Sequence, residues 1–186
     1  MSFTVTPQSI PDVLLIEHRE FADERGAFTE TFRAAAFEEL GLPALVQDNQ
    51  SRSAKGVVRG LHYQVNPNAV GKLVRCLKGR IFDVAVDLRQ GSPSYGKWTA
   101  IELSGDDSKM FYVPEGFAHG FMAMEDDTLV AYRQTGYWSA AHERALVWDD
   151  VDLAIDWPKL PPLLSPKDAI AKRFSEVDHN FVYSAR

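Results

Sequence analysis

The stretch IFDVAVDL, residues 81–88, decides the fold class of this chain. Its side chains alternate, so that one face carries Phe82, Val84, Val86 and Leu88 and the other carries Asp83, Ala85 and Asp87. A period of two is typical of a β-strand that is buried on one face. We therefore expect a half-buried strand here, and Lys78-Gly79 just before it predicts a hairpin turn.

Other short apolar stretches on both sides of this strand are separated by turn residues. Further strands are predicted at residues 72–77, 98–103, 110–113, 120–124 and 128–135. Many short strands with turns between them indicate a sandwich or barrel, not alternating βα units. Only two short helices are predicted, one over Ala34–Leu40 that ends at Gly41 and one that begins at Pro166 with Ser165 as its N-cap.

Length and composition limit the classes of protein to which the chain can belong. With 186 residues, 45% of them hydrophobic, the chain can bury one substantial core, and we expect a single domain over residues 1–186. A net charge of −6 argues against binding nucleic acid, which requires a basic surface. No apolar stretch resembles a secretion signal or a membrane span, so we expect no membrane partner and a cytoplasmic protein. The lone Cys76 predicts a buried structural thiol.

Two segments each place a histidine among residues typical of a binding site. His62 lies within Arg59–Gln64, and His119 follows a Pro/Gly turn within Pro114–Phe121. Either histidine alone is compatible with a structural role. Together the segments resemble those of the cupin superfamily, whose Pro-x-Gly-x-x-His pattern is matched by Pro114, Gly116 and His119. The resemblance implies a mainly β fold, a double-stranded β-helix or jelly roll.

The first histidine segment departs from the pattern of metal-binding cupins. Those proteins carry His-x-His and a following glutamate, whereas this chain has Gln64 in place of the second histidine and Lys72 as the next charged residue. A divalent ion requires several deprotonated nitrogen or oxygen ligands. We therefore predict no metal, and an acid/base pocket at the same positions.

A closer resemblance, to the dTDP-4-dehydrorhamnose 3,5-epimerase family, runs from Phe21 to Asp168 and leaves residues 169–186 as a C-terminal tail that matches nothing interpretable. Its motifs are Asp23–Gly26 with Phe28 and Glu30, Gln47–Asn49, Gly56–Gln64, Lys72–Cys76, Phe82–Asp87, Pro114–Phe121, Tyr132, Tyr137 and Leu164–Asp168. Val70-Gly71 and Arg144 depart from many relatives at loop positions. The proposed acid, base and oxyanion positions are all retained.

The resemblance implies the substrate and the catalytic residues. The family's substrate is a dTDP-linked 4-keto-6-deoxyhexose, whose C3 and C5 hydrogens are acidic because both carbons flank the ketone, so no cofactor is expected. By residue match, His62 is the base and Asp168 orients it. Lys72 stabilises the charge on the ketone oxygen, and Tyr132 is the proton donor on the opposite face.

The resemblance also implies substrate contacts and a homodimer. Matching positions for the diphosphate, the sugar and the nucleotide are Arg25, Glu30, Gln47, Asp48, Asn49, Arg59, His119, Tyr137, Glu143 and Lys167. In this family Arg25 and Glu30 lie on a strand, here near residues 21–32, that is exchanged across a dimer. We therefore expect these two residues to complete the pocket of a second copy, although a simple turn and edge strand would also fit residues 23–30.

Some of these residues have alternative structural roles. Asp168 is the third helical residue after Ser165, where an acid serves as a capping-box partner, and we expect it to fill only one of its two possible roles well. Tyr132 alone would be interpreted as a core residue and Lys72 alone as a solvated cation. Their joint match to one family favours the catalytic interpretation.

Three other functions remain open at this stage. A relative that epimerises only C3 or only C5 would carry the same catalytic residues. A non-catalytic cupin that binds a small molecule would need no paired acid and base. A metal-dependent cupin oxygenase or isomerase is the third, and Gln64 and Lys72 argue against it.

Overall fold

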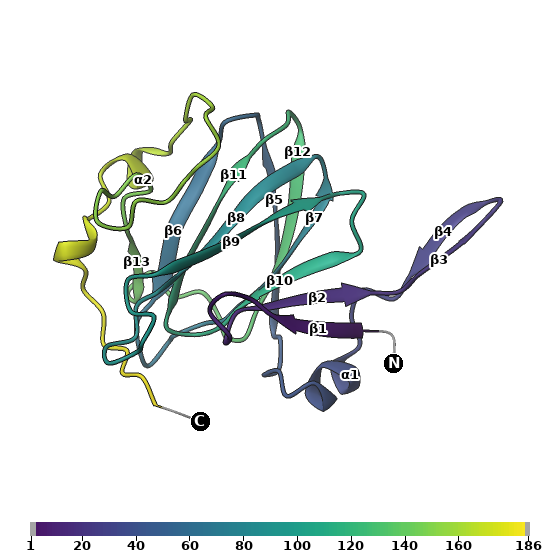
Figure 1. The fold of residues 1–186 in the computed structure, drawn as a ribbon, viewed down its shortest axis with the longest axis horizontal. Coiled ribbons are helices and arrows are strands. Elements are labelled where there is room, and N and C mark those ends of the chain that lie inside the picture. The colour runs from purple at the N-terminus through teal and green to yellow at the C-terminus, as the bar shows by residue number, and fades with distance from the viewer. Residues whose placement is uncertain (1–2, 185–186) are drawn as a thin grey trace.

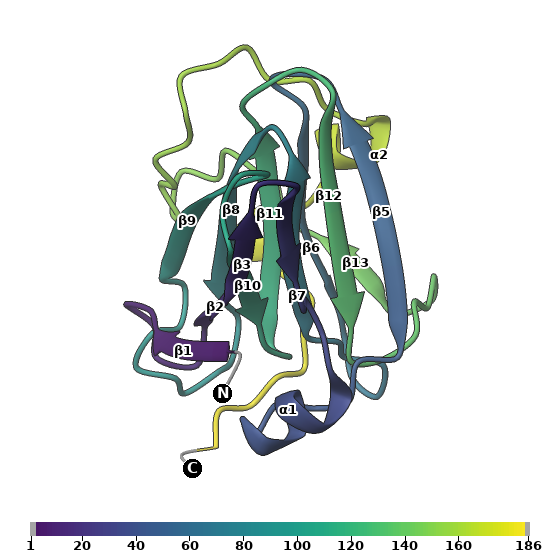
Figure 2. The ribbon, with the colours of Figure 1, turned by 90° about the vertical axis from the view of Figure 1, so that its right-hand side faces the viewer.

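The computed structural model describes residues 3–184 and contains two antiparallel sheets packed face to face (Figures 1 and 2). The six-stranded sheet has the order β1 (Phe3–Pro7), β2 (Leu14–His18), β10 (Lys109–Val113), β7 (Lys72–Lys78), β12 (Thr128–Gln134), β5 (Gln47–Ser53). The five-stranded sheet has the order β13 (Glu143–Ala145), β6 (Val58–Gln64), β11 (Phe117–Ala123), β8 (Arg80–Asp87), β9 (Trp98–Ser104). The chain passes repeatedly between the sheets, as in a jelly roll, so the predicted mainly β fold is confirmed.

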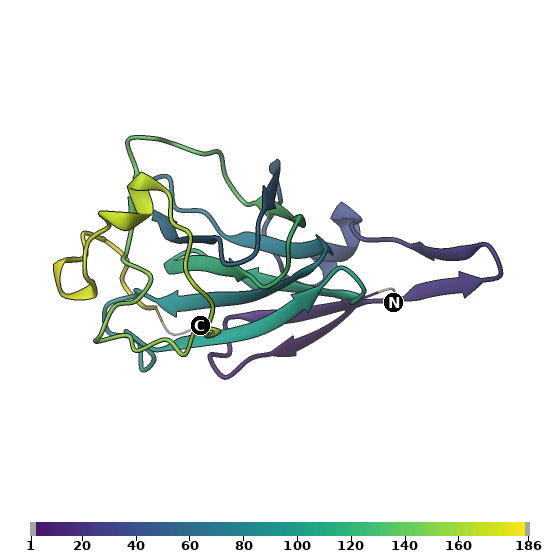
Figure 3. The same ribbon diagram turned by 90° about the horizontal axis from the view of Figure 1, so that it is seen from above.

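The remaining elements are short. A hairpin of β3 (Glu20–Asp23) and β4 (Gly26–Thr29) projects far beyond the sheets (Figure 3). Helix α1 covers Ala34–Glu39, helix α2 covers Pro166–Ala169 and a 3-10 helix, η1, covers Phe174–Glu176. Ser165 is the N-cap of α2, and both predicted helices are confirmed. Within residues 3–184 no helix has the length and apolar character needed to span a bilayer.

The prediction of a half-buried strand at residues 81–88 was wrong about its second face. Val84 and Val86 face a cluster that includes the C-terminal segment, while Ile81 and Ala85 face the interior between the sheets. Asp83 and Asp87 are completely buried. Their burial is offset by hydrogen bonds: Asp83 is bonded to His119, and Asp87 accepts from Arg89 and two serines.

The predicted hairpin at Lys78-Gly79 was also wrong. Strand β7 pairs with β10 and β12, whereas β8 pairs with β9 and β11, so the turn carries the chain from one sheet to the other. Gly79 has φ = +76°, and a Cβ there would lie 2.5 Å from Thr128 Oγ1. The glycine signal identified a tight turn, but it could not show which strands pair across it.

Three apolar clusters lie at different depths in the fold. One fills the space between the sheets and includes Cys76, whose thiol is buried as predicted and has its pKa raised to about 11 by that burial. A second lies between α1 and the outer face of the six-stranded sheet. The third lies between the outer face of the five-stranded sheet and the C-terminal segment, where Phe181 is buried. The tail, which sequence motifs left unexplained, therefore covers one face of the barrel.

Candidate active site

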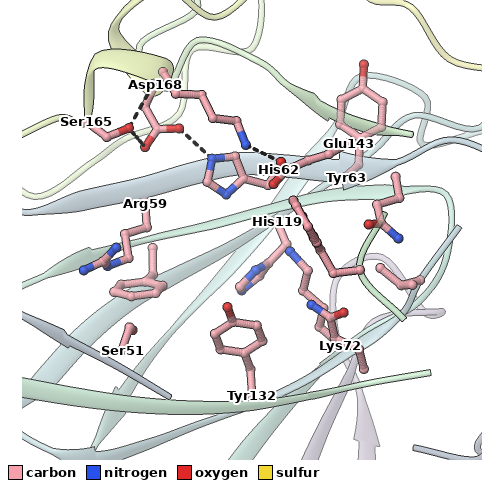
Figure 4. Close-up of a pocket in the computed structure, with 16 residues that line it drawn as sticks. Ser51, Arg59, His62, Tyr63, Lys72, His119, Tyr132, Glu143, Ser165 and Asp168 are labelled. Atoms are coloured by element: carbon pink, nitrogen blue, oxygen red, sulfur yellow. Dashed lines mark hydrogen bonds and ion pairs between the residues drawn. The ribbon is translucent and has the colours of Figure 1, made fainter. Parts of the chain in front are cut away.

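A cavity of about 280 Å³ is lined by strands of both sheets (Figure 4). Its lining is Ser51, Arg59, His62, Tyr63, Gln64, Val70, Lys72, His119, Phe121, Tyr132, Gln134, Trp138, Glu143, Ser165, Lys167 and Asp168. All four predicted catalytic residues are among these side chains. The cavity is therefore the candidate active site.

His62 lies on β6 and is held by a buried carboxylate from α2. Its Nε2 is 2.6 Å from Asp168 Oδ1. Burial raises the pKa of Asp168, but the hydrogen bond and charge of His62, with the Ser165 hydroxyl, outweigh burial and leave that pKa lowered. An ionised carboxylate has no hydrogen to donate, so Nε2 carries the hydrogen and Nδ1 keeps a lone pair that can accept a proton.

Asp168 takes the orienting role, and its bonds to Ser165 are not those of a capping box. Its backbone N–H donates to Ser165 Oγ at 3.1 Å, and the same hydroxyl donates to Asp168 Oδ2 at 2.9 Å. The other carboxylate oxygen, Oδ1, faces His62. A capping box would need the Asp168 carboxylate to accept from the Ser165 backbone N–H, whereas Oδ2 accepts from the Ser165 hydroxyl instead. The expectation that Asp168 fills only one of the two roles well therefore stands, and that role is the support of His62.

A second histidine–aspartate pair lies beside the first. His119 of β11 is the cross-strand neighbour of His62, and its Nε2 is 2.7 Å from Oδ1 of the buried Asp83. Burial lowers the pKa of His119 despite the opposing effect of Asp83. Sequence reasoning placed Asp83 on a solvent face and missed its contact with a predicted site residue.

Lys72 lies on β7 and lines the cavity, and among residues 3–184 its ammonium group has no hydrogen-bond or ion-pair partner. Burial lowers the pKa of Lys72 to about 8, and the charges of Asp83 and Glu143 offset only part of that shift. An ammonium group in such a place is free to bind an incoming oxygen, because no protein group must first release it.

Tyr132 comes from β12 of the six-stranded sheet, and Figure 4 shows it across the cavity from His62, which the five-stranded sheet supplies. Burial raises the pKa of Tyr132 above its usual 10, so the phenol keeps its hydrogen at neutral pH. A molecule held between the sheets would thus meet a base on one side and a proton donor on the other. That arrangement suits removal and return of a proton at one carbon with inversion.

Charged residues surround the mouth of the cavity. Lys167 Nζ lies 2.6 Å from Glu143 Oε2. Burial raises the pKa of Glu143, but the hydrogen bond and charge of Lys167 outweigh burial and lower it overall. Arg59 donates to Ser53 Oγ and to the Arg52 carbonyl, which fixes the guanidinium at the cavity wall.

The predicted nucleotide contacts on β5 lie next to the cavity without lining it. Gln47 donates to Asn49 Oδ1 and accepts the Trp138 N–H at 2.9 Å, while Asn49 is the cross-strand neighbour of Tyr132. Asp48 points away and lies 3.4 Å from Arg133. Tyr137 is 70% exposed beside the mouth.

Neither Arg25 nor Glu30 lines the cavity of its own chain. Arg25 lies at the tip of the projecting hairpin, pairs with Asp23 and has a side chain that is 85% exposed (Figure 1). Glu30 pairs with Arg33 at 3.3 Å. Both side chains are therefore engaged in ion pairs outside the cavity lining.

Sequence reasoning missed several of the lining residues. Ser51, Phe121 and Gln134 each lie two positions from a predicted residue on the same strand, so strand alternation could have identified them. Val70 and Ser165 lie in segments that the family comparison of motifs had already singled out, whereas no signal marked Trp138, which lies in a loop. Within residues 3–184, no group of three His, Cys, Asp or Glu side chains is placed to hold a metal ion.

Comparison with known proteins agrees with this geometry. The sequence model described as dTDP-4-dehydrorhamnose 3,5-epimerase matches residues 7–176, a wider range than the motifs indicated. The protein of that name from Pseudomonas aeruginosa is 50% identical over 176 residues, 93% of this chain and 97% of its own. A dTDP-4-dehydrorhamnose 3-epimerase from Streptomyces niveus is 41% identical over 172 residues, 91% of this chain and 83% of its own.

A solved structure is similar over nearly the whole fold. The dTDP-6-deoxy-D-glucose-3,5-epimerase of Legionella pneumophila, determined in complex with dTDP-4-keto-L-rhamnose, superposes with a TM-score of 0.94 at 44% identity. The alignment covers 98% of this chain and 100% of that one.

Proposed function

This chain belongs to the dTDP-4-dehydrorhamnose 3,5-epimerase family, and from that premise we propose that it inverts C3 and C5 of a dTDP-linked 4-keto-6-deoxyhexose. The substrate would be dTDP-4-dehydro-6-deoxy-D-glucose and the product dTDP-4-dehydro-L-rhamnose. The enzyme is an isomerase of the carbohydrate epimerase type. We also propose that the enzyme is cytoplasmic and that its product is a precursor of the dTDP-rhamnose used for cell-wall polysaccharide.

The mechanism uses one base, one acid and one cation. His62 Nδ1 takes the proton from the carbon beside the ketone, and the electron pair of the broken C–H bond moves to form an enolate at O4. Lys72, as an ammonium, stabilises that oxygen, and Tyr132 then gives its phenolic proton to the same carbon from the opposite face. Exchange with water returns the proton of His62 to solvent and restores that of Tyr132.

The proposal depends on one observation: His62 and Tyr132 belong to different sheets. A sugar between the sheets has His62 on one face and Tyr132 on the other, with Lys72 between them (Figure 4). Simple binding of a sugar needs no acid and base on opposite sides. Inversion of a carbon adjacent to a ketone requires both.

The diphosphate and nucleotide contacts are proposed for the charged and polar residues around the mouth. Arg59 and Lys167 supply cations on the cavity wall, with His119 and Glu143 near the sugar. Gln47, Asp48, Asn49 and Tyr137 are proposed to contact the nucleotide from the adjacent edge strand and loop.

We further propose a homodimer in which each hairpin completes the partner's pocket. Among residues 3–184, the two strands of the hairpin pair only with each other, and its Phe28 is 71% exposed. Strand β5 is an edge strand, with backbone groups available to pair with another strand. Arg25 and Glu30 would reach a diphosphate or nucleotide only in such an assembly.

Solvent deuterium exchange tests the reaction directly. The chelator-treated protein would be incubated in deuterated water with dTDP-4-keto-6-deoxyglucose, and the sugar examined by NMR. Deuterium at both C3 and C5 is the expected result. Deuterium at neither carbon would refute the proposed function.

Inversion at a single carbon is the second candidate, favoured by the similarity to the 3-epimerase from Streptomyces niveus. Such an enzyme would serve a deoxysugar of a natural product and use the same four residues. Deuterium at only one carbon would establish this alternative.

A further inference from the structure

Gln64 is buried at the end of β6, two residues after His62, and its amide is committed to the protein. Its Nε2 donates to the Asn68 carbonyl at 2.7 Å and to the Tyr137 carbonyl at 3.2 Å. Its Oε1 accepts the Ser139 N–H at 2.6 Å. Both amide hydrogens are therefore used, and Gln64 has no donor left for a bound sugar.

These three bonds join two loops that border the cavity. Asn68 lies in the loop that leads to Lys72, whereas Tyr137 and Ser139 lie in the loop between β12 and β13. The same loops also meet at Gly71 and Thr135, where Gly71 N–H donates to Thr135 Oγ1 and Thr135 N–H to the Gly71 carbonyl. Gln64 is thus the side chain that ties both loops to the strand carrying His62.

Trp138 lies between the two residues that Gln64 binds in the second loop. Its own backbone N–H donates to Gln47 Oε1. The backbone of Tyr137, Trp138 and Ser139 is thus held by two glutamine side chains, Gln64 and Gln47. The Trp138 side chain lines the cavity, and the residue is 55% exposed. An exposed aromatic side chain on a loop keeps one position only where its backbone is fixed.

We infer that Gln64 is a positioning residue that holds Trp138 as one wall of the substrate pocket and takes no part in proton transfer. The position where a metal-binding cupin would carry a ligand thus fixes the shape of the pocket. The inference rests on the proposed function for one of its tests, because that test measures KM for the 4-keto sugar nucleotide.

Gln64→Met keeps the side-chain length and removes all three hydrogen bonds, so it is the variant to test. We expect KM to rise about tenfold with kcat within about twofold of wild type, because ordering the loop then costs binding free energy. The pH dependence of kcat should stay as in wild type, since His62 and Asp168 are untouched.

The second measurement follows Trp138 without any ligand. Acrylamide quenching of Trp138 fluorescence, obtained as the difference from a Trp138→Phe background, should increase in Gln64→Met. The KM effects of Gln64→Met and Trp138→Phe should also fail to add in the double variant, because both act through the same side chain.

Asn180→Ala is the matched control. The Asn180 side chain makes two hydrogen bonds to the backbone of Asn66, at the start of the first loop, from the surface of the protein. Its removal should change neither KM nor the quenching of Trp138. If Gln64→Met does not fold, as judged by circular dichroism, Gln64→Asn provides a milder shortening that retains the amide.

Three results would overturn the inference: a fall in kcat at unchanged KM, unchanged quenching of Trp138, or strictly additive effects in the double variant. A wild-type protein that exchanges no deuterium would refute the proposed function. The quenching difference, measured without ligand, would still decide whether Gln64 holds Trp138.

Discussion

At the scale of single residues, the two histidines of the site differ in their surroundings and therefore in the roles they can take. His62 and His119 are cross-strand neighbours, each bonded to a buried aspartate, yet they differ in exposure. The His62 side chain is 26% exposed and faces the cavity, whereas that of His119 is 8% exposed. The more accessible histidine can exchange its proton with solvent, which a recycling base requires.

The division of labour between His62 and Tyr132 predicts different effects of their removal. His62→Ala should reduce deuterium exchange by roughly 10³-fold, because no other group removes the proton. Tyr132→Phe should retain some exchange and lose inverted product, since His62 can return the proton only to the face from which it came. NMR of the sugar after incubation in deuterated water separates the two outcomes, and equal, complete loss of exchange in both variants would contradict these roles.

The lowered pKa of Lys72 predicts a decline in activity at alkaline pH. The ammonium form stabilises the enolate, and it is lost as pH rises through about 8, so kcat/KM should fall across that range. Tyr132, with its pKa raised above 10, stays protonated there and does not cause the decline. A pH–rate profile checks this prediction.

Lys72→Arg is the matched variant for the alkaline decline, because a guanidinium remains charged across the range. Its residual activity should show no decline near pH 8. A decline that persists in Lys72→Arg would assign the titration to another group.

At the scale of secondary structure elements, the four residues of α2 form the support for the base. Ser165 caps the helix and holds Asp168 through both backbone and carboxylate, so the start of the helix fixes the orientation of His62. The strands determine the rest, because alternation along β6, β7 and β12 directs His62, Lys72 and Tyr132 inward.

Loss of the α2 cap should therefore reduce catalysis as well as local stability. Ser165→Ala should destabilise α2 by about 1 kcal/mol and lower kcat about tenfold, because Asp168 loses a hydrogen-bond donor and its fixed position. Ser165→Thr keeps the hydroxyl and should retain most activity. Steady-state kinetics with a thermal melt checks both, and full activity in Ser165→Ala would show that α2 needs no cap to hold His62.

At the scale of the whole molecule, the projecting hairpin predicts active sites shared between two copies. Arg25→Ala and His62→Ala should each be inactive or strongly impaired as homodimers. In a mixed dimer, the subunit with an intact His62 would receive an intact Arg25 from its partner and form one complete site. Co-expression of the two variants should therefore restore activity.

Two measurements check the exchanged hairpin. Analytical ultracentrifugation should give the mass of a dimer. A mixed dimer has one complete site of its two and should show about half of the wild-type rate, so a randomly assorted co-expressed pool should show about a quarter. A monomeric protein, or mixed variants without any recovered activity, would contradict the exchange.

Much of the fold and the site could be predicted from residue patterns. Alternation located the central strands, and Ser165 with Pro166 located α2, because these signals depend on backbone geometry over a few residues. The family motifs brought His62, Lys72, Tyr132 and Asp168 together, and the structure places all four around one cavity. The two edge strands of the six-stranded sheet, β1 and β5, gave no clear pattern, since exposed strands tolerate many residue types.

The sequence by itself determined the local conformations and the chemical groups, whereas the tertiary structure decided which of those groups meet. The sequence pattern predicted a solvent-facing Asp83, but the second sheet and the C-terminal segment cover both faces of β8. It also predicted a hairpin at Lys78-Gly79, but the strands on either side of this turn belong to different sheets. Asp168 lies 106 residues from His62, and Gln64 lies 73 residues from Tyr137. Contacts over such separations are set by sheet pairing and burial, which no short stretch of sequence specifies.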